Sequence, residues 1–466
     1  MTHPQIIQGG MGAGVSDWRL ANAVSQMGCL GVVSGTALDN ILARRLQLGD
    51  PQGHMRRAMA HFPNQEIVTR ITDKYFIPNG KKATDPFKPV PLYSENPNPT
   101  LVELTVLANF IEVFLAKENH NGVVGINYLE KIQLPNLPSL YGAMLANVDY
   151  VLMGAGIPKD IPGSLDTLSQ HQKTALKIHI ENARNGEEVT FHFDPAQINI
   201  STKEPLKRPF FLAIISSVTL ATALARKSNG KVDGFIIEKP SAGGHNAPPR
   251  GPLTCNEKGE PIYGPKDEVD ISKIKKLEIP FWMAGAYADP QKLQDVLQQG
   301  AAGIQVGTVF AFCEESGLED HLKQDVLKKL WRNTIKVITD PVASPTGFPF
   351  KVVQMETERT RNRNRTCDLG YLRTAYLKEN GTLGFRCPSE NVDTYLKKGG
   401  TLEATTGRKC LCNALLANIG LPQQRKVGPE MPLLTAGDDI NAIKKFVPKE
   451  QTSYSAQEVI HYLQQV

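Results

Sequence analysis

The sequence carries little net charge for its length. Its 52 basic and 47 acidic side chains leave a formal charge of +5 on 466 residues. A charge this small does not by itself indicate nucleic acid or a membrane surface as a partner, and the sequence predicts neither.

Long hydrophobic runs are also missing. The most apolar stretch, 210–225, contains two serines and two threonines, and it is shorter than the roughly 18 to 20 residues that a bilayer requires. We expect it to form a strand followed by a helix. The first ten residues lack the basic region and apolar core of a secretory signal, so we expect a cytoplasmic protein.

Paired cysteine motifs are absent too. The 7 cysteines are an odd number and include no C-x-x-C pair, which argues for reduced thiols rather than a disulfide framework. Four of them, Cys367, Cys387, Cys410 and Cys412, fall within about fifty residues of one another. Four thiolates would suffice for a zinc ion or an iron–sulfur cluster, and the alternative of plain packing in a small core stays open.

The sequence does have the alternating pattern of strands and helices that is typical of an α/β protein. Short apolar runs that end in glycine or polar residues alternate with longer amphipathic segments up to about residue 315. The eight runs that we predict as strands are 5–8, 30–34, 123–127, 150–153, 210–215, 234–238, 281–284 and 303–306. Eight strands that are each nearly all apolar favour a closed (β/α)₈ barrel, a TIM barrel, over an open sheet.

Several segments exceed what a barrel needs. We assign residues 1–320 to the barrel, with insertions at about 60–120 and 160–208. The first insertion contains a proline-rich loop before a strong helix at 100–118, and the second contains an extra strand at 189–193. A C-terminal extension, 321–466, carries the four clustered cysteines, begins with a helix and ends in an amphipathic helix.

Active sites of such barrels lie at the carboxyl ends of the strands. The glycine loop 9–16 follows the first strand, and we expect Ser16 to cap the next helix. Such a loop holds a phosphate or a flat ring, or is a simple tight turn. Small residues after the last two strands, at Gly285 and at Gly307 with Thr308, predict a phosphate cradle.

The loop "SAGGHN" follows the sixth strand, which ends at Glu238. This loop brings His245 to the carboxyl ends of the strands, where we expect the active site. There a near-neutral pKa of the imidazole would suit proton transfer or binding of an oxyanion. Asn127 ends the third strand and is placed to bond the edge of a ring.

These motifs resemble the nitronate monooxygenase family, FMN-binding barrels once called 2-nitropropane dioxygenases, and the related flavin-dependent enoyl-acyl carrier protein reductases. The resemblance rests on "IIQGGMG", "VGIN", "SAGGHN", "IPFWMAGAYAD" and "GIQVGTVFAF", in this order, over about residues 4–317. It implies FMN as the cofactor and His245 as the catalytic residue facing substrate. The cofactor-binding residues it implies are Gly9, Gly10, Met11, Asn127, Glu238, Gly243, Gly244, Gly285, Ala286, Gln305, Gly307 and Thr308. The family usually has glycine and isoleucine where this chain has Ala286 and Tyr287.

The expected activity is oxidation of an alkyl nitronate by O₂ to a carbonyl compound and nitrite. The alternatives are an NAD(P)H-dependent enoyl reductase, with an acyl carrier protein as partner, and an FMN-bound binding module with little turnover. A homo-oligomer stays open. The arginine row Arg359, Arg361, Arg363 and Arg365 would form an anion-binding face in an extended strand. Packing against the barrel is the alternative, and the lack of interleaved aromatic residues argues against nucleic acid.

Overall fold

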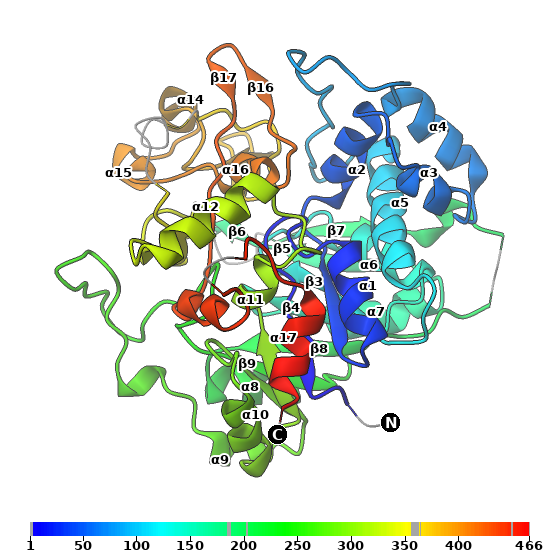
Figure 1. The fold of residues 1–466 in the computed structure, drawn as a ribbon. Coiled ribbons are helices and arrows are strands. Elements are labelled where there is room, and N and C mark those ends of the chain that lie inside the picture. Colours follow the sequence, from blue (N-terminus) through cyan, green and yellow to red (C-terminus); the bar gives the residue numbers. More distant parts are fainter. Residues whose placement is uncertain are drawn as a thin grey trace.

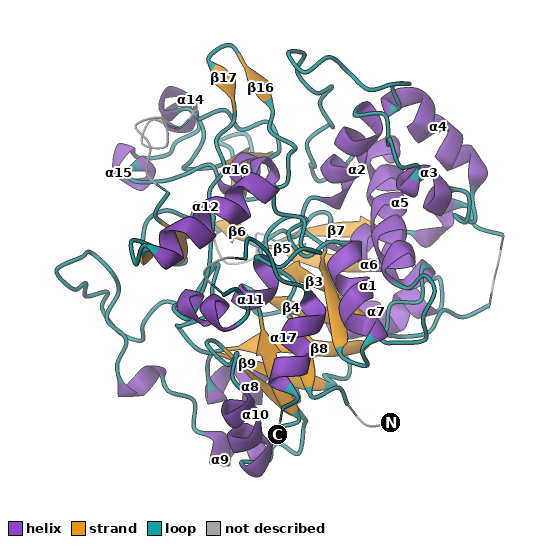
Figure 2. Ribbon diagram, in the orientation of Figure 1, coloured by secondary structure: helices purple, strands orange, loops and turns teal. Residues whose placement is uncertain are grey.

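The computed structural model describes residues 3–183, 188–201, 204–355, 363, 365–448 and 451–465. At its centre eight parallel strands close into a barrel in the order β1, β11, β10, β9, β8, β4, β3, β2 (Figures 1 and 2). Their bounds are β1 Ile6–Gln8, β2 Leu30–Ser34, β3 Val124–Leu129, β4 Tyr150–Gly154, β8 Phe210–Ile215, β9 Gly234–Glu238, β10 Phe281–Ala284 and β11 Gly303–Val306. All eight predicted strands, and with them the TIM-barrel fold, are confirmed.

Side chains fill the interior of the barrel. Its buried core consists of Ile7, Leu30, Val32, Tyr150, Leu152, Leu212, Ile236, Trp282 and Ala284. Successive side chains of a strand point to opposite faces, so Glu238 points to the same side as Ile236, one layer nearer the carboxyl end. Asn127 likewise follows Gly125, where an added Cβ would meet Val32 and Leu152 inside the barrel. The barrel interior therefore changes from apolar to polar at its mouth.

Helices surround the barrel and continue into the C-terminal extension (Figure 1). The α-helices are α1 Trp18–Gln26, α2 Leu38–Gln47, α3 His54–Met59, α4 Gln65–Tyr75, α5 Pro99–Ala116, α6 Asn136–Leu145, α7 Ile161–Ser169, α8 Val218–Lys227, α9 Ile271–Lys275, α10 Pro290–Gln298, α11 Thr308–Ala311, α12 Asp320–Trp331, α14 Val392–Lys397, α15 Leu402–Thr405, α16 Leu411–Ala417 and α17 Ala456–Leu463. Three short 3₁₀ helices are η1 Pro195–Ile198, η2 Pro265–Asp267 and η3 Ile440–Lys445. The helices predicted at 100–118, after the strand at 210–215 and at both ends of the extension are confirmed.

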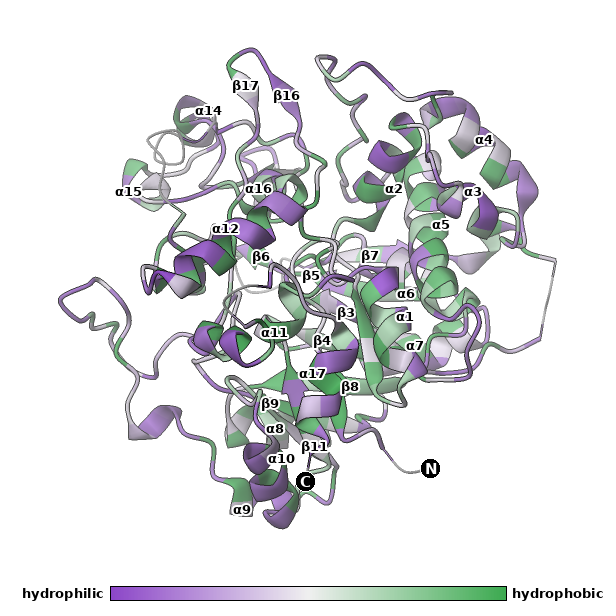
Figure 3. Cartoon of the chain, in the orientation of Figure 1, coloured by the Kyte–Doolittle hydropathy of each residue, from purple (hydrophilic) through white to green (hydrophobic). Residues whose placement is uncertain are grey.

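Helix α5, with 18 residues, is the longest helix in the part of the chain that the structure describes. It is long and apolar enough to cross a membrane by length and composition, yet 78% of it is buried inside the protein. It packs against α1, α2 and α6, and Figure 3 shows hydrophobic residues along both α5 and the barrel strands. Burial against neighbouring helices therefore accounts for its apolar composition.

The predicted helix cap at Ser16 is wrong by one residue. Asp17 is the N-cap of α1, where its carboxylate accepts hydrogen bonds from the backbone N–H groups of Arg19 and Leu20. The Ser16 hydroxyl instead donates to the Gly9 carbonyl oxygen at 3.0 Å. Ser16 thus shapes the glycine loop rather than the helix.

Small sheets join the insertions to the extension. Strand β6 (Ile180–Glu181) of the second insertion pairs in parallel with β14 (Thr374–Leu377), which pairs with β15 (Leu383–Arg386). The remaining strands form the antiparallel pairs β5 Thr174–Ile178 with β7 Val189–Phe193, β12 Val337–Asp340 with β13 Phe350–Val353, and β16 Gln424–Arg425 with β17 Gly428–Pro429. The predicted extra strand at 189–193 is confirmed as β7.

Close contact between α5 and α6 depends on Gly142. A Cβ at this position would lie 2.2 Å from the carbonyl oxygen of Val106, so the helices would have to separate. We expect Gly142→Ala to lower the free energy of unfolding by about 2–3 kcal/mol, the usual scale for overpacking. Urea unfolding measures this. Gly264→Ala, where an added Cβ meets nothing within 4 Å, should leave stability unchanged, and equal stability of both variants would contradict the prediction.

Candidate functional site

A cavity of about 220 Å³ opens at the carboxyl ends of the barrel strands. Its walls come from the loop after β1, the ends of several strands and parts of the extension. The predicted site residues that line it are Gly9, Gly10, Met11, Asn127, Glu238, Gly243, Gly244, His245, Gly285, Ala286, Gln305, Gly307 and Thr308. The structure thus brings together every residue predicted for the barrel mouth, although they come from six separate segments of the chain.

The glycine loop after β1 forms one wall and is held from behind by two buried polar side chains. The Gln8 amide donates to the Ser16 hydroxyl oxygen at 2.9 Å, and its carbonyl oxygen accepts from Val32 N–H at 3.0 Å. The Ser16 hydroxyl oxygen also accepts from Met11 N–H at 2.9 Å. At Gly10 an added Cβ would lie 2.5 Å from Asn127 Cβ, so only glycine fits here. The loop is therefore a fixed backbone surface.

Two amide side chains in the cavity have oxygen atoms without partners. Among the described residues, Asn127 Oδ1 and Gln305 Oε1 are buried and accept no hydrogen bond. A buried acceptor without a donor costs about 1–3 kcal/mol. Both atoms are therefore well suited to accept from N–H or O–H groups of a bound ligand.

The two turns that follow β10 and β11 lie at another side of the cavity. Gly285 has a φ of 101°, and Ala286 has a φ of 60°, in the left-handed region that glycine adopts more readily. The Lys292 ammonium of α10 donates to the Ala286 carbonyl oxygen at 2.6 Å. It thereby places a positive charge beside this turn, as a phosphate cradle requires.

Glu238 faces the cavity from the end of β9. Burial raises the pKa of its carboxyl group to about 8. At neutral pH the group is therefore mainly a neutral acid, able to donate a hydrogen bond.

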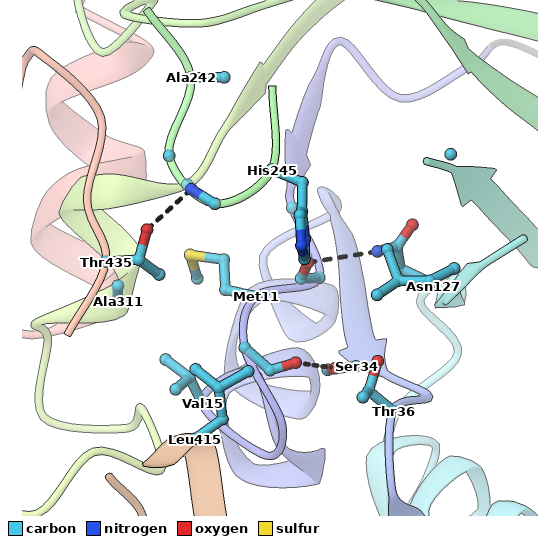
Figure 4. A pocket seen from close by; sticks show the side chains of 18 of the residues that line it. Met11, Val15, Ser34, Thr36, Asn127, Ala242, His245, Ala311, Leu415 and Thr435 are labelled. Atoms are coloured by element: carbon cyan, nitrogen blue, oxygen red, sulfur yellow. Dashed lines mark hydrogen bonds between the residues drawn. The ribbon is translucent and has the colours of Figure 1, made fainter. Parts of the chain in front are cut away.

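His245 reaches the cavity from the loop after β9 (Figure 4). Its Nε2 lies 2.7 Å from the hydroxyl oxygen of Ser344, and the ring packs edge-on against Phe350. Burial, together with the nearby charge of Lys131, lowers the pKa of His245 to about 4. The near-neutral pKa expected from the sequence is therefore wrong, and the imidazole is neutral at physiological pH.

The extension holds the His245 loop in place. Gly244 N–H donates to the hydroxyl oxygen of Thr435 at 2.8 Å, and the Gly244 carbonyl accepts from Lys351 N–H at 2.9 Å. A Cβ at Gly243 would lie 2.9 Å from backbone atoms of Ala436 and its successor. Gly243, which the resemblance implies as a cofactor-binding residue, therefore brings the backbone of this loop close to the extension.

Sequence reasoning assigned none of the cavity-lining residues of the extension to this site, and the only site role it predicted for Cys412 was that of a metal ligand. The lining residues are Phe350, Tyr371, Leu372, Leu411, Cys412, Leu415, Asn418, Leu434, Thr435, Ala436 and Asp439. Figure 4 shows Leu415 and Thr435 facing the same pocket as Met11 and Asn127. Short elements without a repeating pattern carry these residues, and no local sequence signal identifies them.

The four clustered cysteines surround a second, much smaller cavity of about 10 Å³. A hydrogen bond from the Cys387 thiol lowers the pKa of Cys367, and Cys412 lies in the walls of both cavities. In the part of the chain that the structure describes, no three His, Cys, Asp or Glu side chains are placed to hold a metal ion. The predicted zinc or iron–sulfur site therefore finds no support, and the thiols pack together in a small apolar space.

The arginine row does not form one anion-binding face in the part that is described. Arg359 and Arg361 lie outside the described residues. Arg363 donates to the carbonyl oxygens of Met431 and its successor at 2.7 and 2.5 Å, and Arg365 donates to Thr405 O at 3.1 Å. These two guanidinium groups hold loops of the extension together through backbone carbonyls, so these contacts are neither an anion-binding face nor packing against the barrel.

The sequence model of the nitronate monooxygenase family matches residues 160–371. A probable nitronate monooxygenase of Staphylococcus haemolyticus is 32% identical over 138 residues, which are 29% of this chain and 36% of that protein. A probable nitronate monooxygenase of Staphylococcus saprophyticus is 28% identical over 191 residues, 41% of this chain and 50% of that protein. The matches therefore span half or less of these relatives.

Among solved structures, nitroalkane oxidase from Streptomyces ansochromogenes is similar, with 15% identity. The alignment covers 98% of this chain and 94% of that one, with a TM-score of 0.44.

The raised pKa of Glu238 makes stability depend on pH. In the unfolded chain a glutamate titrates near 4.5, so between this pH and about 8 the folded state holds the proton more strongly. Folding is therefore penalised increasingly as pH rises through this range. We expect Glu238→Gln to raise the free energy of unfolding at pH 7 by about 2–3 kcal/mol. The free energy of unfolding of this variant should also decrease less between pH 5 and 8 than that of the wild type.

Chemical denaturation of the ligand-free protein at several pH values measures this effect. Glu257→Gln, an exposed site, is the matched control and should behave as the wild type does. A variant at position 238 that is less stable than wild type at pH 7 would show that the ionised carboxylate is the favoured form.

Proposed function

We propose that this chain, whose residues 160–371 match the sequence model of the nitronate monooxygenase family, is an FMN-dependent nitronate monooxygenase. It would oxidise alkyl nitronates with O₂ to a carbonyl compound and nitrite. The observation that carries the proposal is the single cavity in which the glycine loop, two unpartnered amide oxygens and neutral His245 meet.

The residues present suit FMN. Gly9 and Gly10 offer flat backbone against which a ring can lie, and the free oxygens of Asn127 and Gln305 can accept from the ring N–H of an isoalloxazine. The turns at Gly285 and Gly307 offer small residues for a phosphate. When bound, FMN supplies a ring that takes electrons from the substrate and passes them to oxygen.

His245 would hold the anionic end of the substrate. With Nε2 engaged by Ser344, Nδ1 is the ring nitrogen left to contact a nitronate oxygen. A pKa of about 4 makes the imidazole a weak base, so we assign it a role in binding and orienting the anion rather than in removing a proton from carbon.

The extension would bind the alkyl part. Leu372, Leu411 and Leu415 give the cavity an apolar wall, and transfer of an alkyl group to such a wall is favourable by about 0.8 kcal/mol for each CH₂. The same wall also suits the acyl chain of an enoyl thioester, and this observation keeps an NAD(P)H-dependent enoyl reductase as the second candidate.

Anaerobic mixing separates the two candidates. We expect purified protein to carry one FMN per chain and its visible flavin absorption to bleach with an alkyl nitronate, because the cavity offers His245 to an anion. Readmission of O₂ should then restore the colour and release nitrite. Bleaching by NADPH with turnover of an enoyl thioester, and none by nitronate, would identify the reductase instead. Protein that binds no flavin would contradict both.

Substitution of His245 tests its role. We expect His245→Ala to keep FMN but to lower the rate of flavin reduction by nitronate roughly 10²-fold, because the anion loses its positioned partner. We expect the rate of flavin reduction by a neutral nitroalkane to fall by the same factor. A clearly larger loss with the nitroalkane would show that His245 is the base. His461→Ala, at an exposed site on α17, is the control and should react as wild type.

A further inference from the structure

One segment of the extension, 434–439, lies against the turn at Thr308. Gly437 N–H donates to the Thr308 hydroxyl oxygen at 2.9 Å, and Asp438 N–H donates to the carbonyl of Ser241 at 3.0 Å. A Cβ on Gly437 would lie 2.8 Å from that same carbonyl oxygen. The segment is therefore fitted closely onto the barrel mouth.

This contact determines where the Thr308 proton points. Because the hydroxyl oxygen accepts from Gly437, its own hydrogen is available to the carboxylate of Asp439, with which it is hydrogen-bonded. Asp439 is half-buried and lines the large cavity together with Gly285, Ala286 and Gly307. An acidic side chain thus lies at the cradle that the sequence assigns to a phosphate.

Few charges are available to offset this carboxylate. Lys292 faces it from α10 and is held by the Ala286 carbonyl. Asp438 faces it from its own segment and pairs with Lys351 of β13 at 2.6 Å. Burial raises the pKa of Asp439, with Asp438 adding to the rise, while the Thr308 hydroxyl and Lys292 oppose it.

A phosphate dianion in this cradle would meet an ionised carboxylate. Two like charges about 4 Å apart repel by about 4 kcal/mol at an effective dielectric constant near 20. A protonated carboxyl group removes the repulsion and can donate a hydrogen bond to a phosphate oxygen, which the carboxylate cannot do.

We infer that Asp439 is a proton-linked residue of the phosphate subsite, which takes up one proton from solvent when the phosphate monoester of FMN binds. The inference rests on the proposed function. Because a proton is taken up on binding, FMN affinity should fall as pH rises. Because Asp439 belongs to the extension, the extension then takes part in cofactor recognition.

The test measures FMN binding to flavin-free protein by calorimetry and fluorescence between pH 7 and 9. The second pKa of a phosphate monoester is about 6, so the ligand is a dianion throughout this range. For wild type we expect affinity to fall by up to tenfold for each pH unit, with close to one proton taken up in buffers of different ionisation heat.

Asp439→Asn should bind FMN roughly tenfold more tightly than wild type at pH 8, with an affinity that hardly changes with pH. Asp295→Asn, the same charge change on the exposed side of α10, should behave as wild type. Riboflavin, which lacks the phosphate, should bind all three proteins alike at every pH.

Several results would overturn the inference. These are a wild-type affinity that is constant from pH 7 to 9, an Asp439→Asn variant as pH-dependent as wild type, or weaker FMN binding by that variant. Equal effects of Asp439→Asn on riboflavin and FMN would overturn it while leaving the proposed function intact. Wild type that binds neither flavin would overturn the proposed function as well.

Discussion

The hydrogen bonds between the His245 loop and the extension are the constraint on which the site depends. Gly244 uses both its backbone groups there, its N–H on Thr435 and its carbonyl on Lys351 N–H. Buried backbone groups need partners, and a loop of this kind at the mouth of a barrel cannot supply them itself. The position of His245, its contact with Ser344 and its packing on Phe350 all follow from this attachment.

Because the extension is attached to the barrel mouth, the walls of the cavity come from two parts of the chain. The barrel provides the rigid backbone surface at Gly9 and Gly10 and the amide oxygens of Asn127 and Gln305, held by strands that are closed into a cylinder. The extension adds an apolar wall that includes Leu372, Leu411 and Leu415. In barrels the scaffold stays constant while the surrounding segments vary, so differences in substrate choice between this chain and shorter barrels would arise in the extension.

The barrel could be predicted from the sequence because its strands are local signals. Each is a short, nearly all-apolar run with a clear end, which is the pattern of a strand buried on both faces. The residues at the strand ends followed from the same pattern, which is why Asn127, Glu238 and Gln305 were found. Thr435 and Asp439 were not, because their role depends on contacts with residues more than a hundred positions away. The pKa of His245 was missed for the same reason, since burial by the extension lowers it.

The polar groups of the cavity share one electrostatic property. Burial favours the neutral form of each: it raises the pKa of Glu238 and Asp439 and lowers that of His245. With Glu238 and His245 neutral, the cavity has little fixed charge apart from Asp439, so most of the charge inside it is introduced by its ligands. An anion that enters then interacts with hydrogen-bond donors at low effective dielectric, where each contact is stronger than in water. A neutral Glu238 can donate a hydrogen bond to an anion, which a carboxylate would repel, so burial turns an apparently acidic pocket into one that accepts anions.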